Sequence, residues 1–402
     1  MRILQFCKKL PFPPKDGESI AILNISKGLA EAGHEVTVFA INTKRHRGRL
    51  DAIPSNLKDT IRFHAVDLDT DPHWWSAITN LVGRRSYHIS RFYDKKVLSP
   101  LRALLESETY DIIQLEGLFG LQYLQDIRSW QSSPIVYRAH NIEYRIWNRL
   151  LLNEPNPIKR NYLEIQTKRL HDFERNMVTK VDGWVPISPL DGDLLRELDR
   201  DMPRHISPAT VRLEDWTRAS ETGTKRTIGF LGGLDWMPNQ EGLRWFIEKA
   251  LPSIRASVEE VEFHIAGRNQ PDWMEAWRAD DVFLHGEVDD AASFLADKSV
   301  IIVPLLSGSG MRIKIIEAMA AQKAIVSTSI GAEGIPVENG KDIFLADYPK
   351  DFSDAVVRLL SEPSLANEMA GLARTTVEQH FDYRPVCRKL VEFYEALISV
   401  YT

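Results

Sequence analysis

The chain has few cysteines, no excess of basic residues and no long apolar run, and each shortage excludes a class of protein. Its 402 residues include two cysteines, Cys7 and Cys387, which lie near opposite ends and form neither a disulfide framework nor a metal-binding motif. The formal net charge of -6 argues against a nucleic-acid-binding protein, because such domains are usually basic. The sequence contains no run of about eighteen apolar residues, the length needed to span a membrane. The apolar run after Met1 is too short for a signal peptide. We therefore expect a cytoplasmic protein.

Length and patterning point to two domains. A chain of 402 residues with 44% hydrophobic and 26% charged residues is typical of a soluble protein that exceeds one core. Apolar, β-branched segments alternate with helical patterns along both halves, which predicts α/β domains with doubly wound parallel sheets. The strand-like segments are 2–6, 34–41, 111–115, 134–139 and 183–188, then 227–234, 261–267, 282–286, 300–306, 324–329 and 342–347. We expect one domain over 1–207, a second over 208–380 and a C-terminal helix over 381–402 that packs back on the first.

The most informative stretch is 299–334, which reads as strand, glycine loop, helix and strand. Its loop opens onto a helix predicted over 311–321, where free N–H groups and the positive end of the helix dipole favour an anion. Arg312 and Lys314 add two positive charges in the first turn, where the dipole alone would favour acids. We therefore predict a phosphate site, with Glu317 one turn further in to accept hydrogen bonds from hydroxyls such as those of a ribose. The alternative is an ordinary crossover whose charged side chains are solvated.

Residues that follow the predicted strands of the first half are candidates for a second binding site, because ligands of open parallel sheets bind at the carboxyl ends of the strands. These residues are Gly17, Glu116, Arg138, His140 and Asn141. Gly17 precedes a helix with Ser19 as its expected N-cap, a place where backbone can approach a ligand closely. His140 is either a packing or helix-capping histidine or a polar group aimed at a substrate.

The chain resembles, over nearly its whole length, the retaining glycosyltransferases of the GT-B fold, family 4. The resemblance is carried by PFPPKDG, DIIQLEG and YRAHNIE in the first half and by GFLGGLDWMPNQEGLRWF, FHIAGRN, FLHGEV and GSGMRIKIIEAMAAQKAIVSTSIGAEGI in the second. It implies two Rossmann-like domains that face a cleft, with the final helix crossing back to the first domain. The second domain would hold a nucleoside diphosphate sugar, and the first would hold the acceptor.

On the acceptor side, the resemblance assigns His140 to the family's active-site histidine near the reacting sugar. It places Glu116 where many members have another histidine, and it places Gly17, Arg138 and Asn141 on the side of the acceptor. His140 would position the sugar or the acceptor rather than act as a nucleophile.

On the donor side, the loop 232–239 lacks the Arg and Lys that the family often places there, so Arg312 and Lys314 would neutralise the diphosphate instead. Glu317 matches the second of two family glutamates, the one that binds the ribose, whereas Ser309 stands where the first would contact the donor sugar. Further donor-binding positions are Gly233, Arg268, His285, Ser309, Gly310 and Met311.

The implied activity is transfer of a hexose-type sugar from a nucleoside diphosphate sugar to a glycan or lipid-linked acceptor, with retention of anomeric configuration, in polysaccharide or cell-envelope biosynthesis. Preorganised cations and amides would stabilise the negative charge on the leaving diphosphate. No Asp-x-Asp motif comes directly after one of the predicted strands, so we expect neither a metal requirement nor a cofactor. Two alternatives are open: a nucleotide-sugar-binding protein without turnover, favoured by Ser309, and a nucleotide-sugar epimerase, which would need further acids and bases near His140.

Residues 72–96 carry no motif but combine aromatic and basic side chains. These are Trp74, Trp75, Arg84, Arg85, Tyr87, Arg91, Phe92, Tyr93, Lys95 and Lys96. The composition suits a sugar, a lipid phosphate or a membrane surface, and we predict that the segment contacts the acceptor or the inner face of the membrane that carries it. The alternative is an amphipathic insertion whose aromatic residues cover the core and whose charges are solvated.

Overall fold

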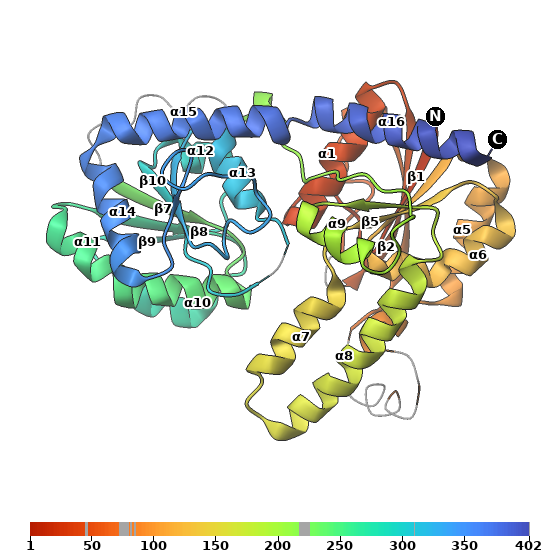
Figure 1. Cartoon of the computed structure of the whole chain (residues 1–402), viewed down its shortest axis with the longest axis horizontal. Coiled ribbons are helices and arrows are strands. Elements are labelled where there is room, and N and C mark those ends of the chain that lie inside the picture. Colours follow the sequence, from red (N-terminus) through yellow and green to blue (C-terminus); the bar gives the residue numbers. More distant parts are fainter. Residues whose placement is uncertain are drawn as a thin grey trace. The chain divides into compact units, whose positions relative to one another are not determined.

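The computed structural model describes residues 1–44, 47–71, 80, 83, 86–216, 226–308 and 310–401, and the chain folds into two compact units. Unit 1 consists of Met1–Pro208 together with Tyr383–Thr402, and unit 2 consists of Ala209–Asp382. Each unit holds a six-stranded parallel sheet with helices on both faces (Figure 1). The doubly wound α/β architecture expected from the sequence is therefore confirmed.

The sheet of unit 1 has the strand order β3-β2-β1-β4-β5-β6. Its strands are β1 (Arg2–Cys7), β2 (Glu35–Thr43), β3 (Ile61–Leu68), β4 (Ile112–Glu116), β5 (Ile135–Ala139) and β6 (Gly183–Pro186). Five of them overlap predicted segments, but β3 is absent from the prediction. As an outer strand it keeps most of its side chains, IRFHAVDL, at least partly exposed, so it lacks the continuous apolar run of an inner parallel strand.

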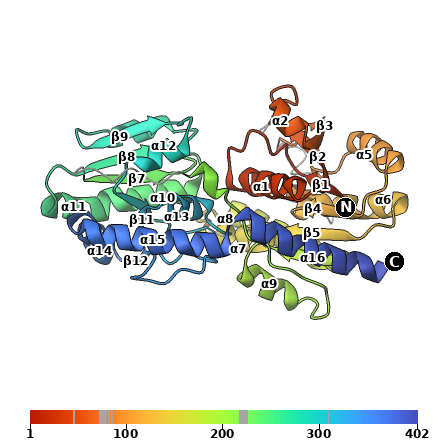
Figure 2. The same cartoon turned by 90° about the horizontal axis from the view of Figure 1, so that it is seen from above.

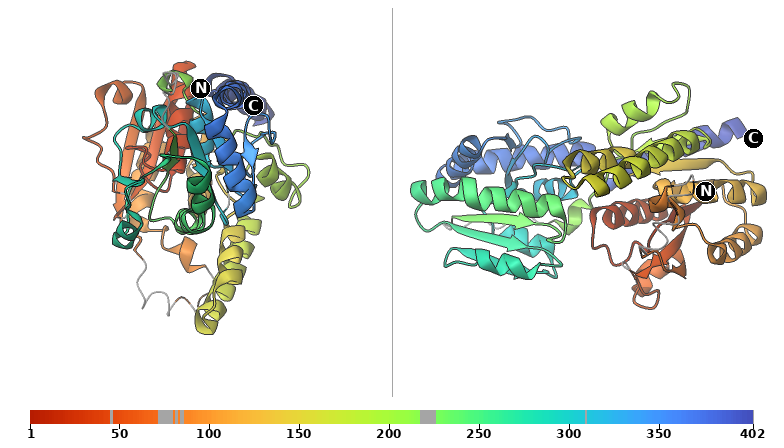
Figure 3. Two further views of the ribbon diagram at one scale, coloured as in Figure 1. Left: turned by 90° about the vertical axis from the view of Figure 1, so that its left-hand side faces the viewer. Right: turned by 90° about the horizontal axis from the view of Figure 1, so that it is seen from below.

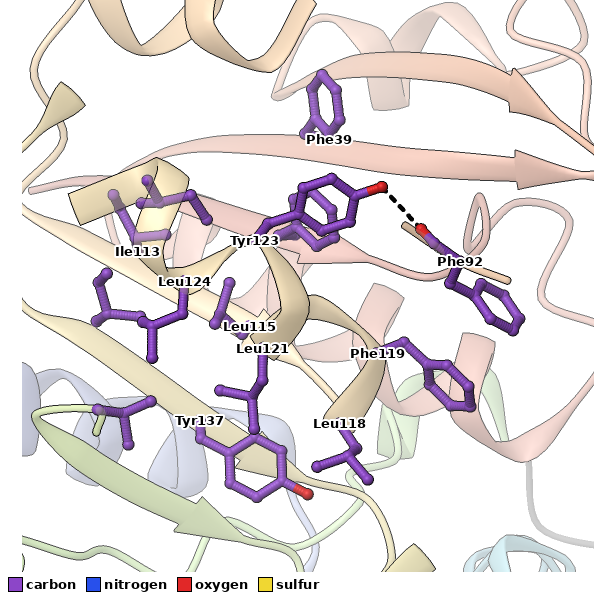
Figure 4. Packing of buried hydrophobic residues seen from close by; sticks show 14 of the residues in the cluster. Phe39, Phe92, Ile113, Leu115, Leu118, Phe119, Leu121, Tyr123, Leu124 and Tyr137 are labelled. Carbon is purple, nitrogen blue, oxygen red and sulfur yellow. Dashed lines mark hydrogen bonds between the residues drawn. The ribbon is translucent and has the colours of Figure 1, made fainter. Parts of the chain in front are cut away.

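The helices of unit 1 cover two cores, one on each face of the sheet. They are α1 (Gly17–Glu31), α2 (Ser55–Lys58), α4 (Tyr87–Ser90), α5 (Lys95–Ser107), η2 (Leu118–Tyr123), α6 (Leu124–Trp130), α7 (Glu143–Asn153), α8 (Pro157–Val178), α9 (Pro189–Arg196) and α16 (Tyr383–Tyr401). Successive strand side chains point to opposite faces, so Ile3 packs with α1 and α16 and Leu4 packs with α5, α6 and α8. In the second core the Tyr123 ring is tilted against that of Phe6, with ring centres 5.2 Å apart. The Tyr123 hydroxyl donates a hydrogen bond of 2.7 Å to the Phe92 carbonyl (Figure 4).

Helix α16 lies beside α1 within unit 1 (Figure 1, Figure 2). The two helices approach each other at Gly28, where a Cβ would lie 2.5 Å from Cys387 Sγ and 2.9 Å from the Tyr383 ring. Buried side chains of α16, among them Leu390 and Leu397, complete the core over the sheet. The C-terminal helix is therefore part of the core of unit 1.

The sheet of unit 2 has the order β12-β11-β10-β7-β8-β9. Its strands are β7 (Thr227–Leu231), β8 (Glu262–Ala266), β9 (Val282–Gly286), β10 (Val300–Val303), β11 (Ala324–Ser327) and β12 (Phe344–Leu345). Its helices are η3 (Leu213–Asp215), α10 (Met237–Trp245), η4 (Phe246–Ala250), α11 (Leu251–Ser257), η5 (Asp272–Trp277), α12 (Ala291–Ala296), α13 (Ile313–Ala320), α14 (Pro349–Ser361) and α15 (Pro363–His380). One core joins α10, α11 and α14 to the sheet, and another joins α12, α13 and α15 to its other face.

Two glycines let backbone segments of unit 2 approach closely next to the end of β7. A Cβ at Gly267 would lie 1.8 Å from the carbonyl oxygen of Gly232, and a Cβ at Gly242 would lie 2.2 Å from that of Pro304. Any larger residue would therefore displace backbone at these points. The contacts bring the loop after β7 to the end of β8, and α10 to the end of β10, which fixes the positions of the residues described below.

Among the described residues, no helix is both long and apolar enough to pass through a membrane.

Candidate functional site

The loop between β10 and α13 has the backbone conformation of a glycine loop. Gly308 and Gly310 have φ values of 119° and 80°, in the region that favours glycine. Helix α13 begins at Ile313, two residues later than predicted, and Arg312 is its N-cap, with an extended backbone and no side-chain hydrogen bond to the helix. The Arg312 side chain therefore does not cap the first turn.

The guanidinium group of Arg312 is held by aromatic and backbone contacts. It lies 5.6 Å from the ring centre of Trp236 in a cation–π contact and donates a hydrogen bond to the Gly310 carbonyl. A Cβ at Gly308 would lie 2.8 Å from Arg312 Nη2 and 3.1 Å from the Trp236 ring. Although it carries a full charge, Arg312 is only 6% exposed. The glycine loop, the indole and the guanidinium group thus form one packed arrangement.

Lys314 reaches from α13 to the loop that follows β7. Its Nζ donates a hydrogen bond of 2.8 Å to Asn239 Oδ1 and lies 4.3 Å from the ring centre of Phe230. A Cβ at Gly232 would lie 2.6 Å from the same Nζ. Burial lowers the pKa of Lys314 to about 7, and the charge of Arg312 lowers it further in the same direction. The ammonium group therefore lies at the loop 232–239, which has no cation of its own.

Glu317 lies one turn after Lys314 on the same helix. Burial raises its pKa to about 7, while the charge of Lys314 opposes this rise. The carboxyl group is therefore easily protonated or deprotonated near neutral pH. Hydrogen-bond donors or a cation on a ligand would favour the carboxylate.

The other predicted donor-side residues do not all lie in one place. Gly233 and Arg268 lie together, because the Gly233 carbonyl accepts 2.7 Å from Asn239 Nδ2 and a Cβ at Gly233 would be 3.9 Å from Arg268 Nε. Gly310 and Met311 belong to the turn that precedes α13. His285, by contrast, lies exposed on the outer strand β9 and shares a hydrogen bond of 2.9 Å with His264. Ser309 lies outside the described residues.

Sequence reasoning did not single out Trp236 or Asn239, although both contact the predicted cations. Asn239 is buried and bridges Lys314 to the Gly233 carbonyl. The sequence did contain a signal for these contacts. The segment DWMPNQ after a predicted strand has no cation, but it carries an amide and an indole that can contact one. Their partners on α13, however, lie more than 70 residues away in sequence.

In unit 1 a second polar cluster surrounds Glu116, which is fully buried at the end of β4. Its carboxylate is bonded to His140 Nε2 at 2.6 Å and accepts from Gln114 Nε2 at 2.5 Å and from Gln5 Nε2 at 3.3 Å. Arg138 Nη1 lies 3.6 Å from the same carboxylate. Burial acts to raise the pKa of Glu116, but Arg138 and His140 outweigh it and lower that pKa below its usual value. The structure thus brings together three of the predicted residues.

The cluster extends through the sheet to two helices. Tyr394 of α16 donates a hydrogen bond to Gln114 Oε1, and Ser26 of α1 donates to Gln5 Oε1 at 2.5 Å. These contacts hold Gln114 and Gln5 so that their amide groups face Glu116. The orientation of His140 therefore depends on side chains from four elements of unit 1.

Charged residues at the start of α1 form a third group in unit 1. The N-cap of α1 is Asp16, whose carboxylate accepts from Ser19 N at 3.0 Å. Our expectation that Ser19 itself caps the helix is wrong, because the helix starts earlier, at Gly17. Lys9 Nζ pairs with Asp16 at 2.7 Å and with Glu18 at 3.3 Å. The backbone of Gly17 is therefore flanked by paired charges.

A carboxylate also marks the start of α7, which follows His140 and Asn141. Glu174 of α8 accepts from the backbone N–H groups of Glu143 at 3.0 Å and Tyr144 at 2.9 Å. Burial raises the pKa of Glu174 to about 8, against the effect of these two donors. The first turn of α7 is thus tied to α8, which fixes the backbone next to His140.

The predicted acceptor-contacting segment 72–96 lies only partly within the described residues. Within 72–96, Trp74, Trp75, Arg84 and Arg85 lie outside the described residues. Phe92 is buried in the core of unit 1, and Tyr93 packs against it, as the alternative of a structural insertion requires for those two aromatic residues. For the described ranges, no group of three or more His, Cys, Asp or Glu side chains could hold a metal ion.

In the comparison with known proteins, glycosyltransferase family models match both parts of the chain. A family model for Glycosyltransferase Family 4 matches residues 16–208, and one for Glycosyl transferases group 1 matches residues 225–362. An uncharacterized 44.6 kDa protein in the cps region of Klebsiella pneumoniae is 25% identical over 400 residues, which cover 96% of this chain and 97% of that protein. Phosphatidyl-myo-inositol mannosyltransferase of Mycolicibacterium smegmatis is 30% identical over 180 residues, which cover 43% and 45% of the two chains.

Solved structures share the fold. Alr3699/HepE from Anabaena, determined in complex with UDP-glucose, has a TM-score of 0.69 to this chain at 13% identity, covering 98% of this chain and 100% of that one. At this level of identity the likeness shows the fold alone.

Proposed function

Because the chain belongs to glycosyltransferase family 4, we propose that it transfers a hexose-type sugar from a nucleoside diphosphate sugar, bound by unit 2, to an acceptor bound by unit 1. The transfer retains the anomeric configuration. The chain needs no metal, because its own cations supply the charge that the leaving group requires.

The arrangement of Arg312 and Lys314 carries this proposal. Both cations are partly or wholly buried at the start of α13, and Lys314 reaches the loop after β7 and the first turn of α10. The negative oxygens of a diphosphate would complement both positive groups through charge-assisted hydrogen bonds. Preorganised positive groups at the leaving oxygen stabilise the transition state more than the ground state. Glu317 would bind the ribose hydroxyls as a carboxylate.

His140 has the complementary role in unit 1. Its bond to Glu116 fixes the ring and makes Nε2 the atom that faces the carboxylate, so Nδ1 is the nitrogen left for a ligand. The imidazole would orient the sugar or the acceptor. The departing phosphate would take the proton of the acceptor hydroxyl on the same face of the sugar, which accounts for retention without a pair of catalytic carboxylates.

The comparisons support a donor and a class of acceptor. HepE was determined with UDP-glucose, which supports a nucleoside diphosphate hexose as donor. One relative lies in a cps region and another is a phosphatidyl-myo-inositol mannosyltransferase. We therefore infer a glycan or lipid-linked acceptor in cell-envelope polysaccharide synthesis, at the cytoplasmic face of the membrane.

The test starts from the donor. Thermal unfolding with UDP-, GDP- and ADP-sugars identifies the nucleotide, because a ligand that binds the folded state raises its stability. Slow hydrolysis of that donor, measured in EDTA, should persist in the wild type and fall about 100-fold or more in Arg312→Ala and Lys314→Ala. Lys341→Ala, which removes an exposed cation paired with Glu338, serves as the matched control. Unchanged affinity of both site variants for the nucleoside diphosphate would overturn the assignment.

Binding without turnover is the second candidate, and Ser309 in place of the family's donor-sugar glutamate favours it. A pure binding protein would be stabilised by the donor but would never hydrolyse it. An epimerase would convert the donor sugar to its epimer without any acceptor, which analysis of the same reaction mixture detects.

A further inference from the structure

The hairpin of α7 and α8 exposes large apolar side chains at its tip. Leu152 near the end of α7 is 67% exposed, Ile158 at the start of α8 is 80% exposed, and Leu150 is 47% exposed. Within unit 1 the two helices extend side by side away from the sheet (Figure 1, Figure 3). Aliphatic side chains grouped at a projecting tip contribute nothing to the core, and such exposed groups usually mark a contact surface.

The charge of the hairpin is opposite to that of the whole chain. Residues 143–178, from the start of α7 to the end of α8, contain seven basic and five acidic side chains, a net charge of +2, although the chain carries -6. The basic residues are Arg145, Arg149, Lys159, Arg160, Lys168, Arg169 and Arg175. Lys159 and Arg160, directly after the exposed Ile158, are themselves exposed. The tip therefore combines apolar groups with an excess of positive charge.

The base of the hairpin is held rigidly. Glu174 ties α8 to the first turn of α7, as described above, and Gln166 of α8 accepts from the backbone N–H of Tyr87 at 2.8 Å. Asn156 caps α8 by accepting from the N–H groups of Ile158 and Lys159 at 3.0 and 3.1 Å. The tip is thus presented in a defined orientation.

We propose that this tip docks on an anionic lipid bilayer, with Leu152 and Ile158 entering the interfacial region and Lys159 and Arg160 contacting lipid phosphates. Apolar side chains flanked by cations are typical of interfacial membrane binding. A nucleic acid would leave the aliphatic groups in water. A stable protein partner would need about 800 Å² on this side, which suits a broad face better than a projecting tip. The inference does not require sugar transfer.

Flotation of the full-length protein with vesicles tests the proposal. The wild type should float with phosphatidylcholine vesicles that contain phosphatidylglycerol and remain behind with phosphatidylcholine alone. Binding should fall as NaCl is raised, because salt screens exposed charges. Absence of flotation with the anionic vesicles, or equal flotation with both kinds, overturns the proposal.

Removal of the two cations Lys159 and Arg160 tests their contribution to vesicle binding. Lys159→Gln with Arg160→Gln should weaken vesicle binding about 25-fold, because each basic residue near an anionic surface contributes about a fivefold factor. The matched control is Lys180→Gln with Lys249→Gln, two exposed lysines that are not part of the hairpin, which should bind like the wild type. If both double variants lose vesicle binding equally, the effect depends on net charge alone, and the proposal that the tip binds the membrane is overturned.

Removal of the apolar groups tests insertion. Leu152→Ser with Ile158→Ser should abolish flotation but leave the thermal unfolding temperature unchanged, since both side chains lie in water in the free protein. Tyr348→Ser with Val400→Ser, at sites 72% and 80% exposed, is the control and should float. Wild-type flotation by the tip variant contradicts insertion. If the protein is retained on heparin but does not float with vesicles, the tip binds a polyanion other than a membrane. If the protein forms a dimer that Leu152→Ser abolishes, the tip binds a second copy of the chain. Either outcome overturns the proposal.

Discussion

If Lys314 binds the diphosphate as proposed, ligand binding should depend on pH. The pKa of Lys314 is lowered to about 7 by burial, so in the free protein the lysine loses its charge as the pH rises through about 7. A diphosphate favours the charged form and must raise this pKa. Binding should therefore take up a proton above pH 7, and affinity should fall up to about tenfold per pH unit there. Calorimetry in buffers of different ionisation heat measures both quantities.

Two controls isolate Lys314. A nucleoside without phosphates does not reach the ammonium group, so its affinity should not fall above pH 7. Its binding should instead release a proton near pH 7, because Glu317, whose pKa is about 7, binds the ribose as a carboxylate. Lys314→Gln should bind the diphosphate weakly and without proton uptake from this source. Proton uptake of equal size in wild type and variant would show that another group titrates.

The buried pair of Glu116 and Arg138 predicts a strong effect on stability. Within the described part of the chain, none of the three guanidinium nitrogens of Arg138 finds a hydrogen-bond partner, so its charge is balanced chiefly by Glu116 at 3.6 Å. Glu116→Gln leaves that charge buried and should lower the free energy of unfolding by about 3–5 kcal/mol. Adding Arg138→Met removes the charge and should restore much of the loss. Urea unfolding of both variants measures the difference.

An exposed ion pair serves as the control for the buried pair of Glu116 and Arg138. Glu106→Gln breaks a surface ion pair with Arg102 of 2.7 Å and should change the free energy of unfolding by less than about 1 kcal/mol. If the losses from Glu116→Gln and Arg138→Met simply add in the double variant, the two residues are not coupled.

At the scale of elements, two helical glycines predict opposite effects of the same substitution. Gly28 of α1 faces Cys387 and Tyr383 of α16, so the Cβ of Gly28→Ala would force the helices apart, which costs about 1–3 kcal/mol. Gly371 lies exposed on α15 with nothing within 4 Å. Gly371→Ala should stabilise by about 1 kcal/mol through helix propensity. Thermal unfolding of both variants checks the prediction, and a stabilised Gly28→Ala would contradict the close packing of α16 on α1.

The same elements show what the sequence could and could not predict. Buried parallel strands are continuous apolar runs and were found, whereas β3, an outer strand with polar alternation, was missed. Helical spacing placed Arg312 and Lys314 on one first turn. Asn239, the partner of Lys314, lies in the first turn of α10, more than 70 residues away in sequence, and only tertiary contact reveals it.

The cluster of unit 1 shows the same limit. Glu116 and Arg138 are neighbours because β4 and β5 pair in parallel with Glu116 opposite Arg138. Strand register of this kind is set by packing of whole elements and cannot be read from two isolated segments. The sequence therefore identified the residues but not their ion pair, and it did not indicate that the pair is tied to α16.

At the scale of the whole molecule, the two units differ in how the chain builds them. Unit 2 is one continuous segment, Ala209–Asp382, whereas unit 1 needs α16 from the far end of the chain. Five apolar side chains of α16 that pack in the core, at about 2 kcal/mol each, amount to about 10 kcal/mol. That equals the whole stability of a typical domain, about 5–15 kcal/mol. The two units should therefore behave differently when the chain is divided.

A fragment of residues 209–382 should fold cooperatively and retain nucleotide binding, because every residue that we assign to the nucleotide lies within it and its sheet is complete. A fragment of residues 1–208 should fail to fold or should aggregate, because the apolar face that α16 covers is exposed. Residues 1–208 joined through a flexible linker to 383–402 should recover a cooperative transition. Circular dichroism and calorimetry with the nucleoside diphosphate measure these outcomes. If fragment 209–382 folds but does not bind the nucleotide, residues of unit 1 contribute to the donor site; if fragment 1–208 folds alone, the stabilising role assigned to α16 is wrong.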